Sequence, residues 1–275
     1  MKKILSYVLF GSEGRYWGNV QYLLIANSAI YPDFHMRFYV HKESMPLPGF
    51  QVLLKMKEMF PNVEIEIITT PYQGTQLTNW RMKPLWEDDV EILICRDLDY
   101  IINALERKSV QHFLNHPEHL IHVIRSYHLH TTPYMAGLVG FRCQPIKNII
   151  RRAVPSFERY LEWGRTNVSY CKDWRWGCDQ ALLRDFFGRL GLYPRTMDCP
   201  QYTAPTSIAE FNPTVVLPEA YQTIDMPGCN LEALAYSESI SPGFTGAPAV
   251  ATTDQVQALS KIVNNVMSKA VDPYV

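Results

Sequence analysis

The sequence has no run of about 18 apolar residues, so we predict no membrane-spanning segment. The apolar stretch at residues 1–10 is short and is followed by Gly11, which is more typical of a buried first strand than of a secretory signal. Only 19% of the 275 residues are charged, and the formal net charge is −1. This balance gives no basis for non-specific nucleic-acid binding, and the 47% hydrophobic content argues against a disordered chain.

The cysteines lack the spacing of a metal or disulfide framework. No two of them form a CxxC pair, and we predict neither a zinc knuckle nor disulfide bridges. Reduced thiols in a cytoplasmic protein are the expectation. The six are Cys95, Cys143, Cys171, Cys178, Cys199 and Cys229.

Strand-like apolar runs alternate with segments of helical spacing in the first half of the chain. This alternation predicts an α/β fold with a mostly parallel sheet flanked by helices. Ligands of such sheets bind beyond the carboxyl ends of the strands. The predicted strands are residues 4–10, 36–40, 63–68 and 90–95, and the predicted helices are residues 15–30, 50–60 and 79–87.

The second half of the chain is less regular. Residues 198–250 have little periodicity, and helical spacing returns at residues 254–270. We predict a catalytic domain at residues 1–197, and an irregular C-terminal arm and helix at residues 198–275 that pack on it. The arm could also form a homodimer contact. Further predicted elements are helices at residues 105–114, 145–163 and 179–190 and strands at residues 120–124 and 138–142.

Two carboxylates directly follow the fourth predicted strand, at Asp97 and Asp99. In an extended chain residues i and i+2 point the same way, so both would converge at the ligand-binding edge. Carboxylate oxygens suit Mn²⁺ or Mg²⁺, which would neutralise a diphosphate leaving group. A surface turn or a helix N-cap is the alternative, because Asp-x-Asp pairs also arise by chance. The position after a strongly apolar strand favours the metal site.

Several segments in a fixed order carry a resemblance to a known family. They are Arg-Asp-x-Asp, a helix, a His-rich strand, a Gly-containing apolar strand and Asp-Gln, at residues 96–99, 105–108, 121–130, 135–142 and 176–183. This order resembles metal-dependent glycosyltransferases of the GT-A fold, and among them a bacterial and large-virus group. The resemblance spans residues 1–195 and implies a Rossmann-like sheet.

The resemblance also implies roles for the acidic segment. Asp99 would be the main metal ligand, for Mn²⁺ or Mg²⁺. Asp97 would bind the metal or the nucleotide ribose, and Leu98 would line the nucleotide site between them.

The loop after the first strand would hold the nucleoside through Phe10, Gly11 and Tyr16. Its glycine allows close backbone approach, and Tyr16 could stack on the base. The alternative is a plain strand-to-helix turn with Tyr16 in the core. Arg81 could reach the diphosphate or the base, or could lie in an exposed cationic turn.

The resemblance places the acceptor side of the site near Asp179, which begins a helix. Asp179 would remove the acceptor hydroxyl proton, although an N-cap is the structural alternative and retaining relatives use an Asp-Gln pair differently. His130 could contact sugar or phosphate, or be an ordinary core or surface histidine. Gly137 could let a sugar lie against the backbone, or mark a bulge.

These observations lead to one principal functional hypothesis. We predict a divalent-metal-dependent glycosyltransferase that moves a sugar from a nucleotide sugar, with UDP favoured, to a glycan or other hydroxyl acceptor with inversion. A nucleotidyltransferase is the alternative enzyme, but the acidic residue in Gly11-Ser12-Glu13-Gly14 suits a triphosphate poorly. A non-catalytic carbohydrate-binding module with the same fold is the third candidate.

Overall fold

The computed structural model describes residues 1–12, 14–98, 104–125, 132–173, 175–192 and 196–200. Most of the predicted C-terminal arm, including the helix expected at residues 254–270, lies outside these residues. In the described part, no helix combines the length and apolar character needed to cross a bilayer.

The described residues form a seven-stranded sheet in the order β3-β2-β1-β4-β6-β5-β7. Neighbouring strands are parallel from β3 to β4 and between β5 and β7, whereas β6 runs antiparallel to both β4 and β5. The predicted α/β fold with a mostly parallel sheet is confirmed. The strands are β1 (Lys2–Leu9), β2 (His35–His41), β3 (Val63–Ile68), β4 (Val90–Arg96), β5 (Ile121–Arg125), β6 (Leu138–Arg142) and β7 (Thr196–Pro200).

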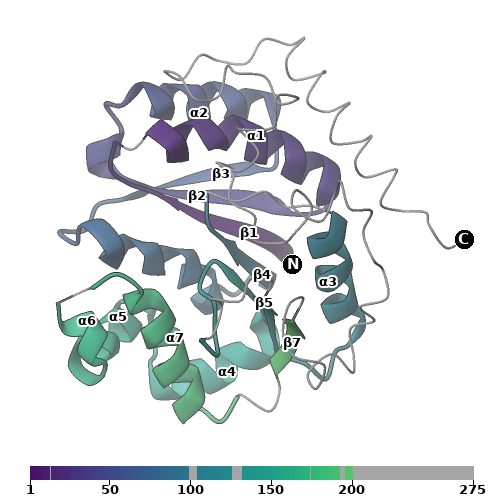
Figure 1. Cartoon of the computed structure of the whole chain (residues 1–275), viewed down its shortest axis with the longest axis vertical. Helices are drawn as coiled ribbons and strands as arrows, with labels where there is room; N and C mark the ends of the chain where they lie inside the picture. Colours follow the sequence, from purple (N-terminus) through teal and green to yellow (C-terminus); the bar gives the residue numbers. More distant parts are fainter. Residues whose placement is uncertain (13, 99–103, 126–131, 174, 193–195, 201–275) are drawn as a thin grey trace, which may run out of the picture.

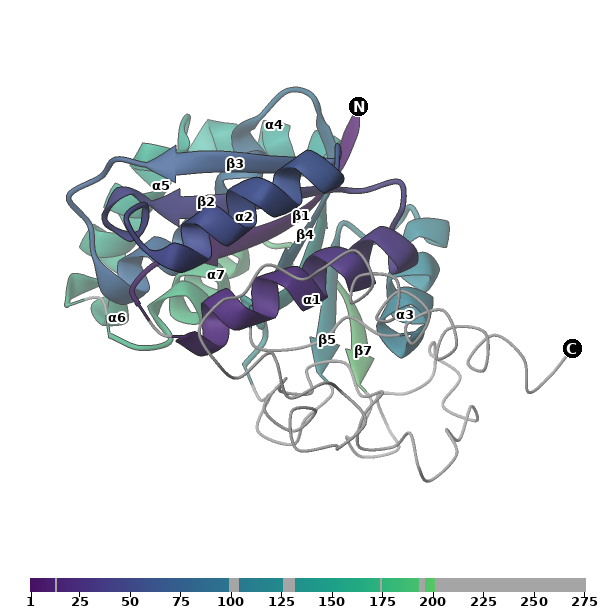
Figure 2. The same cartoon turned by 90° about the horizontal axis from the view of Figure 1, so that it is seen from above.

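Helices cover both faces of the sheet. α1 and α2 lie on one face, and α4, α5 and α7 lie on the other (Figure 1, Figure 2). α3 lies beside α1, where the Arg107 guanidinium is 5.8 Å from the Tyr31 ring centre. The helices are α1 (Gly14–Ile30), η1 (Lys42–Ser44), α2 (Pro48–Met59), η2 (Gly74–Trp86), α3 (Ala104–Asn115), α4 (Cys143–Ala153), α5 (Phe157–Asn167), α6 (Ser169–Lys172) and α7 (Cys178–Arg189), with η1 and η2 being 3₁₀ helices.

The predicted single helix at residues 145–163 is wrong, because the chain forms α4 and α5 there. Pro155 lacks an amide hydrogen and disfavours a helical conformation in the residue before it. Accordingly Val154 is extended, with φ −140° and ψ 115°, and ends α4. Ser156 then caps α5 by accepting a hydrogen bond from the Arg159 amide.

Two other elements also differ from prediction. Strand β7 was not predicted, because Thr196–Pro200 includes a proline and shows no alternation of apolar residues. The segment predicted as a short helix at residues 79–87 is the end of the longer 3₁₀ helix η2, which begins at Gly74. The domain boundary at residue 197 therefore falls inside a strand of the sheet.

Strand register aligns the carboxyl ends of the central strands at one edge. Leu9 of β1 lies opposite Val40 of β2, and Ser6 of β1 lies opposite Cys95 of β4. Phe10 and Asp97, each just beyond its strand, therefore emerge at the same edge. This edge is where the sequence pattern predicts ligand binding.

The packing of α1 against α2 gives a direct test of the fold. A Cβ atom added at Gly49 of α2 would lie 2.7 Å from the ring of the buried Trp17 of α1. We expect Gly49→Ala to lower the free energy of unfolding by about 1–3 kcal/mol, because the rigid indole must shift. Chemical denaturation measures this change.

Gly188→Ala in α7 is the matched control, since within the described part of the chain nothing outside its own helix turn lies within 4 Å of an added Cβ there. It should leave stability unchanged or raise it by up to about 1 kcal/mol. Equal effects of the two substitutions would contradict the described packing of α1 on α2.

Candidate active site

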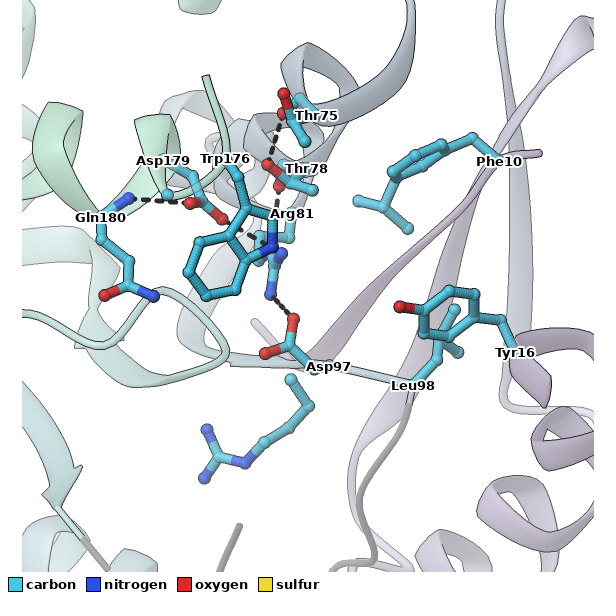
Figure 3. Close-up of a pocket in the computed structure, with 13 residues that line it drawn as sticks. Phe10, Tyr16, Thr75, Thr78, Arg81, Asp97, Leu98, Trp176, Asp179 and Gln180 are labelled. Atoms are coloured by element: carbon cyan, nitrogen blue, oxygen red, sulfur yellow. Dashed lines mark hydrogen bonds and ion pairs between the residues drawn. The ribbon is translucent and has the colours of Figure 1, made fainter. Parts of the chain in front are cut away.

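A cavity of about 400 Å³ opens at the carboxyl ends of β1 and β4 (Figure 3). Three further elements contribute to its wall: α1, η2 and the start of α7. The lining combines aromatic rings, threonine hydroxyls and four charged side chains. It consists of Val8, Phe10, Tyr16, Thr75, Thr78, Arg81, Arg96, Asp97, Leu98, Trp176, Gly177, Asp179 and Gln180.

The 3₁₀ geometry of η2 explains how one short element supplies three of these residues. A 3₁₀ helix has three residues per turn, so Thr75, Thr78 and Arg81 fall on one face. All three line the cavity. The Thr78 hydroxyl donates to the Thr75 carbonyl at 2.7 Å, and Arg81 Nε donates to the Thr78 carbonyl at 2.8 Å. The helix backbone therefore fixes the direction of the Arg81 guanidinium.

Arg81 joins two carboxylates that come from different elements. Its Nη1 donates to Asp97 Oδ1 after β4, and its Nη2 donates to Asp179 Oδ2 of α7 at 3.2 Å. Arg81 is only 5% exposed, so the exposed cationic turn considered for it is wrong. Burial alone would lower the pKa of the Arg81 guanidinium, but Asp97 and Asp179 outweigh that effect and raise it. Arg81 is therefore a permanent buried cation at the centre of the site.

Asp97 is held at the cavity surface, and its side chain remains 45% exposed. A Cβ atom at Gly137 would overlap the Asp97 carboxylate, so only glycine leaves room for it. The adjoining chain is anchored to α1, because Asn19 Nδ2 donates to the Leu98 carbonyl at 2.9 Å. Gly137 thus makes a close approach to the acidic segment, and no bulge is needed to explain it.

Asp179 is buried at the first turn of α7, where it is 8% exposed. Burial raises the pKa of the Asp179 carboxyl, and the Arg81 cation opposes that rise. Asp179 Oδ1 accepts a hydrogen bond from the backbone N–H of Gln180 at 2.9 Å. The residue before α7 that occupies the N-cap position is Gly177, so Asp179 does not fill the N-cap role that was its structural alternative.

Aromatic residues form the opposite end of the cavity from Asp179. Phe10 and Tyr16 line this end, and Tyr16 also packs against the hydrophobic core. Phe10 is shared with a second cavity of about 450 Å³ that Gly11 and His41 help to line. Gly11 has φ +69°, a conformation that favours glycine, and its carbonyl accepts from Trp17 Nε1 at 3.0 Å. The predicted loop residues therefore border two adjoining hollows.

The structure brings most of the predicted site residues together. Asp99 and His130 lie outside the described residues. Among the residues that are described, no group of three His, Cys, Asp or Glu side chains could hold a metal ion by itself. The predicted residues that line the main cavity are Phe10, Tyr16, Arg81, Asp97, Leu98 and Asp179, while Gly11 lines the second cavity and Gly137 lies against Asp97.

Sequence reasoning assigned no role to several other lining residues. Arg96 is 1% exposed and donates to the Cys95 carbonyl at 2.7 Å. Trp176 and Gln180 flank Asp179 along the chain, and the side-chain oxygen of Gln180 accepts from Thr132 Oγ1 at 2.9 Å. Proximity to the Asp-x-Asp and Asp-Gln segments was the available signal for all three. Thr75 and Thr78, which line the cavity from η2, had no such signal.

Comparisons with solved structures find glycosyltransferases. A glycosyltransferase involved in the glycosylation of the major capsid of PBCV-1 is 15% identical, with a TM-score of 0.45, over 74% of this chain and 83% of that chain. The bifunctional glycosyltransferase WbbM is 12% identical, with a TM-score of 0.43, over 72% of this chain and 38% of that chain. The mannosyltransferase PcManGT from Pyrobaculum calidifontis, solved with GDP-Man and Mn²⁺, is 14% identical, with a TM-score of 0.45, over 98% of this chain and 84% of that chain.

No protein-family model matches the sequence, and no curated protein matches it. At such identities and TM-scores we base the function on the geometry of the site.

The cluster of Asp97, Arg81 and Asp179 predicts that replacing Arg81 lowers the free energy of unfolding by an amount that depends on pH. Arg81→Met should lower the free energy of unfolding by about 3–5 kcal/mol at pH 7, because it leaves two carboxylates without their buried partner. Without Arg81 the pKa of Asp179 rises further, so the folded state binds more protons than the unfolded chain. The stability of the Arg81→Met variant therefore falls as pH rises. The difference in unfolding free energy between this variant and wild type should be smaller at pH 5 than at pH 7.

Urea denaturation at both pH values measures this difference. Lys83→Met is the matched control on η2, since Lys83 pairs with Glu66 at 2.7 Å with both side chains about one-third exposed. Its cost should stay below about 1 kcal/mol. An Arg81→Met loss that is the same at pH 5 and pH 7 would contradict the described coupling.

Proposed function

We propose that the protein is a glycosyltransferase that uses a divalent cation to move a sugar from a nucleoside-diphosphate sugar to an acceptor hydroxyl. UDP is the favoured nucleotide and GDP the second choice. One observation supports this proposal most strongly. Asp97 at the end of β4 and Asp179 at the start of α7 share one buried cation, Arg81, in a cavity with aromatic rings at one end.

The charge of the cavity suits a metal-bound diphosphate. Among the described lining residues, two arginines and two aspartates carry formal charges that cancel. A divalent cation would make the site positive, which favours an anionic diphosphate. The remaining positions around such a cation would be filled by phosphate oxygens and water.

The ion pair with Arg81 is compatible with a metal at Asp97. Arg81 binds Oδ1, and the carboxylate lies against Gly137, which has no side chain to cover it. The side chain is also close to half exposed, so a hard cation can reach it. Asp97 and Asp99 would hold Mn²⁺ or Mg²⁺, and the bound cation would stabilise the diphosphate as a leaving group.

Asp179 is suited to act as the base. The acceptor oxygen would form a bond to the anomeric carbon while the bond from that carbon to the diphosphate oxygen breaks. The electron pair leaves with the diphosphate, and the acceptor proton passes to Asp179. A raised pKa makes the Asp179 carboxylate a stronger base than a solvated aspartate. We propose inversion at the anomeric carbon.

The metal-binding role predicts the effect of Asp97→Asn. Wild-type protein should gain thermal stability from Mn²⁺ together with UDP or GDP, and ligand at about 100 times its Kd adds about 2.7 kcal/mol. Asp97→Asn should abolish this metal-dependent gain, because the amide cannot replace the carboxylate. We expect Asp99→Ala to behave in the same way. Thermal-shift assays with and without EDTA measure these effects.

Asp88→Asn is the matched control, because Asp88 precedes β4 at its opposite end and is 81% exposed. It should respond to nucleotide as wild type does. A response to nucleoside triphosphate alone would favour a nucleotidyltransferase, and no response to any nucleotide would favour the carbohydrate-binding module. An undiminished metal-dependent gain in Asp97→Asn would contradict the metal site.

The base role predicts the behaviour of Asp179→Asn. Its kcat should fall by about 10²- to 10⁴-fold, with a smaller change in donor KM, because the lost group acts on the acceptor proton. Proton NMR of the wild-type product should show the anomeric configuration opposite to that of the donor sugar. A product with the donor configuration would contradict the inverting mechanism.

A further inference from the structure

Trp176 is turned outward at the mouth of the cavity, unlike the other tryptophans that the structure describes. It is 85% exposed, whereas Trp17 and Trp86 are 3% and 9% exposed. Trp80 and Trp163 pack against the hydrophobic core. Exposing an entire indole forfeits the stabilisation that its burial would give, so an indole kept at a cavity mouth points to a ligand.

The backbone around Trp176 is fixed even though its side chain is exposed. The Arg175 amide donates to the Tyr170 carbonyl at 3.1 Å, and the Cys178 amide donates to the Arg175 carbonyl at 3.0 Å. Gly177 follows with φ +81°, which favours glycine and turns the chain into α7. The backbone therefore holds the point from which the indole projects in a defined place at the cavity.

Polar groups that suit hydroxyls stand beside the indole. Asp179 and Gln180 line the same end of the cavity as Trp176, away from Phe10 and Tyr16 (Figure 3). Thr132 donates to the side-chain oxygen of Gln180, which leaves the amide Nε2 group to donate to a ligand oxygen. An apolar platform next to a carboxylate and an amide donor matches a sugar ring, which has an apolar C–H face and a hydroxyl edge.

We propose that Trp176 is the platform on which the acceptor sugar ring stacks, so that the acceptor is a glycan presenting a pyranose ring. This inference rests on the proposed function, and it assigns the donor nucleotide to the Phe10 and Tyr16 end. A lipid chain fits less well, because the exposed neighbours Lys172, Asp173 and Arg175 are charged.

Kinetics with a panel of oligosaccharide acceptors test the proposal. Trp176→Ala should raise the acceptor KM about 10- to 100-fold and Trp176→Phe by less, because phenylalanine retains an aromatic face. The donor KM should change less than about 3-fold in both variants. Tyr170→Ala in the neighbouring helix α6 is the control, since Tyr170 is 50% exposed but does not line the cavity, and it should match wild type.

A second readout separates this proposal from the proposed function. Oligosaccharide titration should quench tryptophan fluorescence in wild type and not in Trp176→Phe, even in the absence of donor. Quenching without any sugar transfer would support the platform while the transferase function fails. An unchanged acceptor KM in Trp176→Ala, a donor KM that rises in parallel with the acceptor KM, or equal quenching in Trp176→Phe would overturn the platform.

Discussion

The candidate site depends on one buried guanidinium that satisfies two carboxylates. A charge as buried as Arg81 is tolerated only with close partners, and Asp97 and Asp179 supply them from the end of β4 and the start of α7. Arg81 itself belongs to the 3₁₀ helix η2, where its Nε donates to the backbone carbonyl of Thr78. The three elements are thereby locked in the relative positions that bring both carboxylates into one cavity.

This cluster separates two regions with different chemistry. Phe10 and Tyr16 offer aromatic surface on the side of β1 and α1, whereas Trp176 and Gln180 lie beside Asp179 on the side of α7. The proposed inverting transfer needs such a separation, because the acceptor oxygen attacks the anomeric carbon from the face opposite the departing diphosphate. In the proposed function, the carboxylate after β4 serves the diphosphate and the buried carboxylate serves the acceptor.

The sequence predicted the central sheet well and the surroundings of the cavity less well. Apolar runs ending in Gly11 and Asp97 are local signals, so strands β1 and β4 and their shared edge were accessible from the sequence. Pro155 was a local signal for a helix end, but helical spacing continues on both sides of it. The sequence was therefore interpreted as one helix where the structure has α4 and α5. The bridging role of Arg81 and the outward turn of Trp176 depend on contacts between η2, β4 and α7, which no local pattern encodes.

A crystal structure of the protein with Mn²⁺ and a nucleoside diphosphate tests the central claim most directly. We expect Mn²⁺ bound to the Asp97 carboxylate and to diphosphate oxygens, with the nucleoside toward Phe10 and Tyr16 and with Arg81 still bridging to Asp179. A nucleotide bound away from this cavity, or a metal bound to the diphosphate without Asp97, would contradict it.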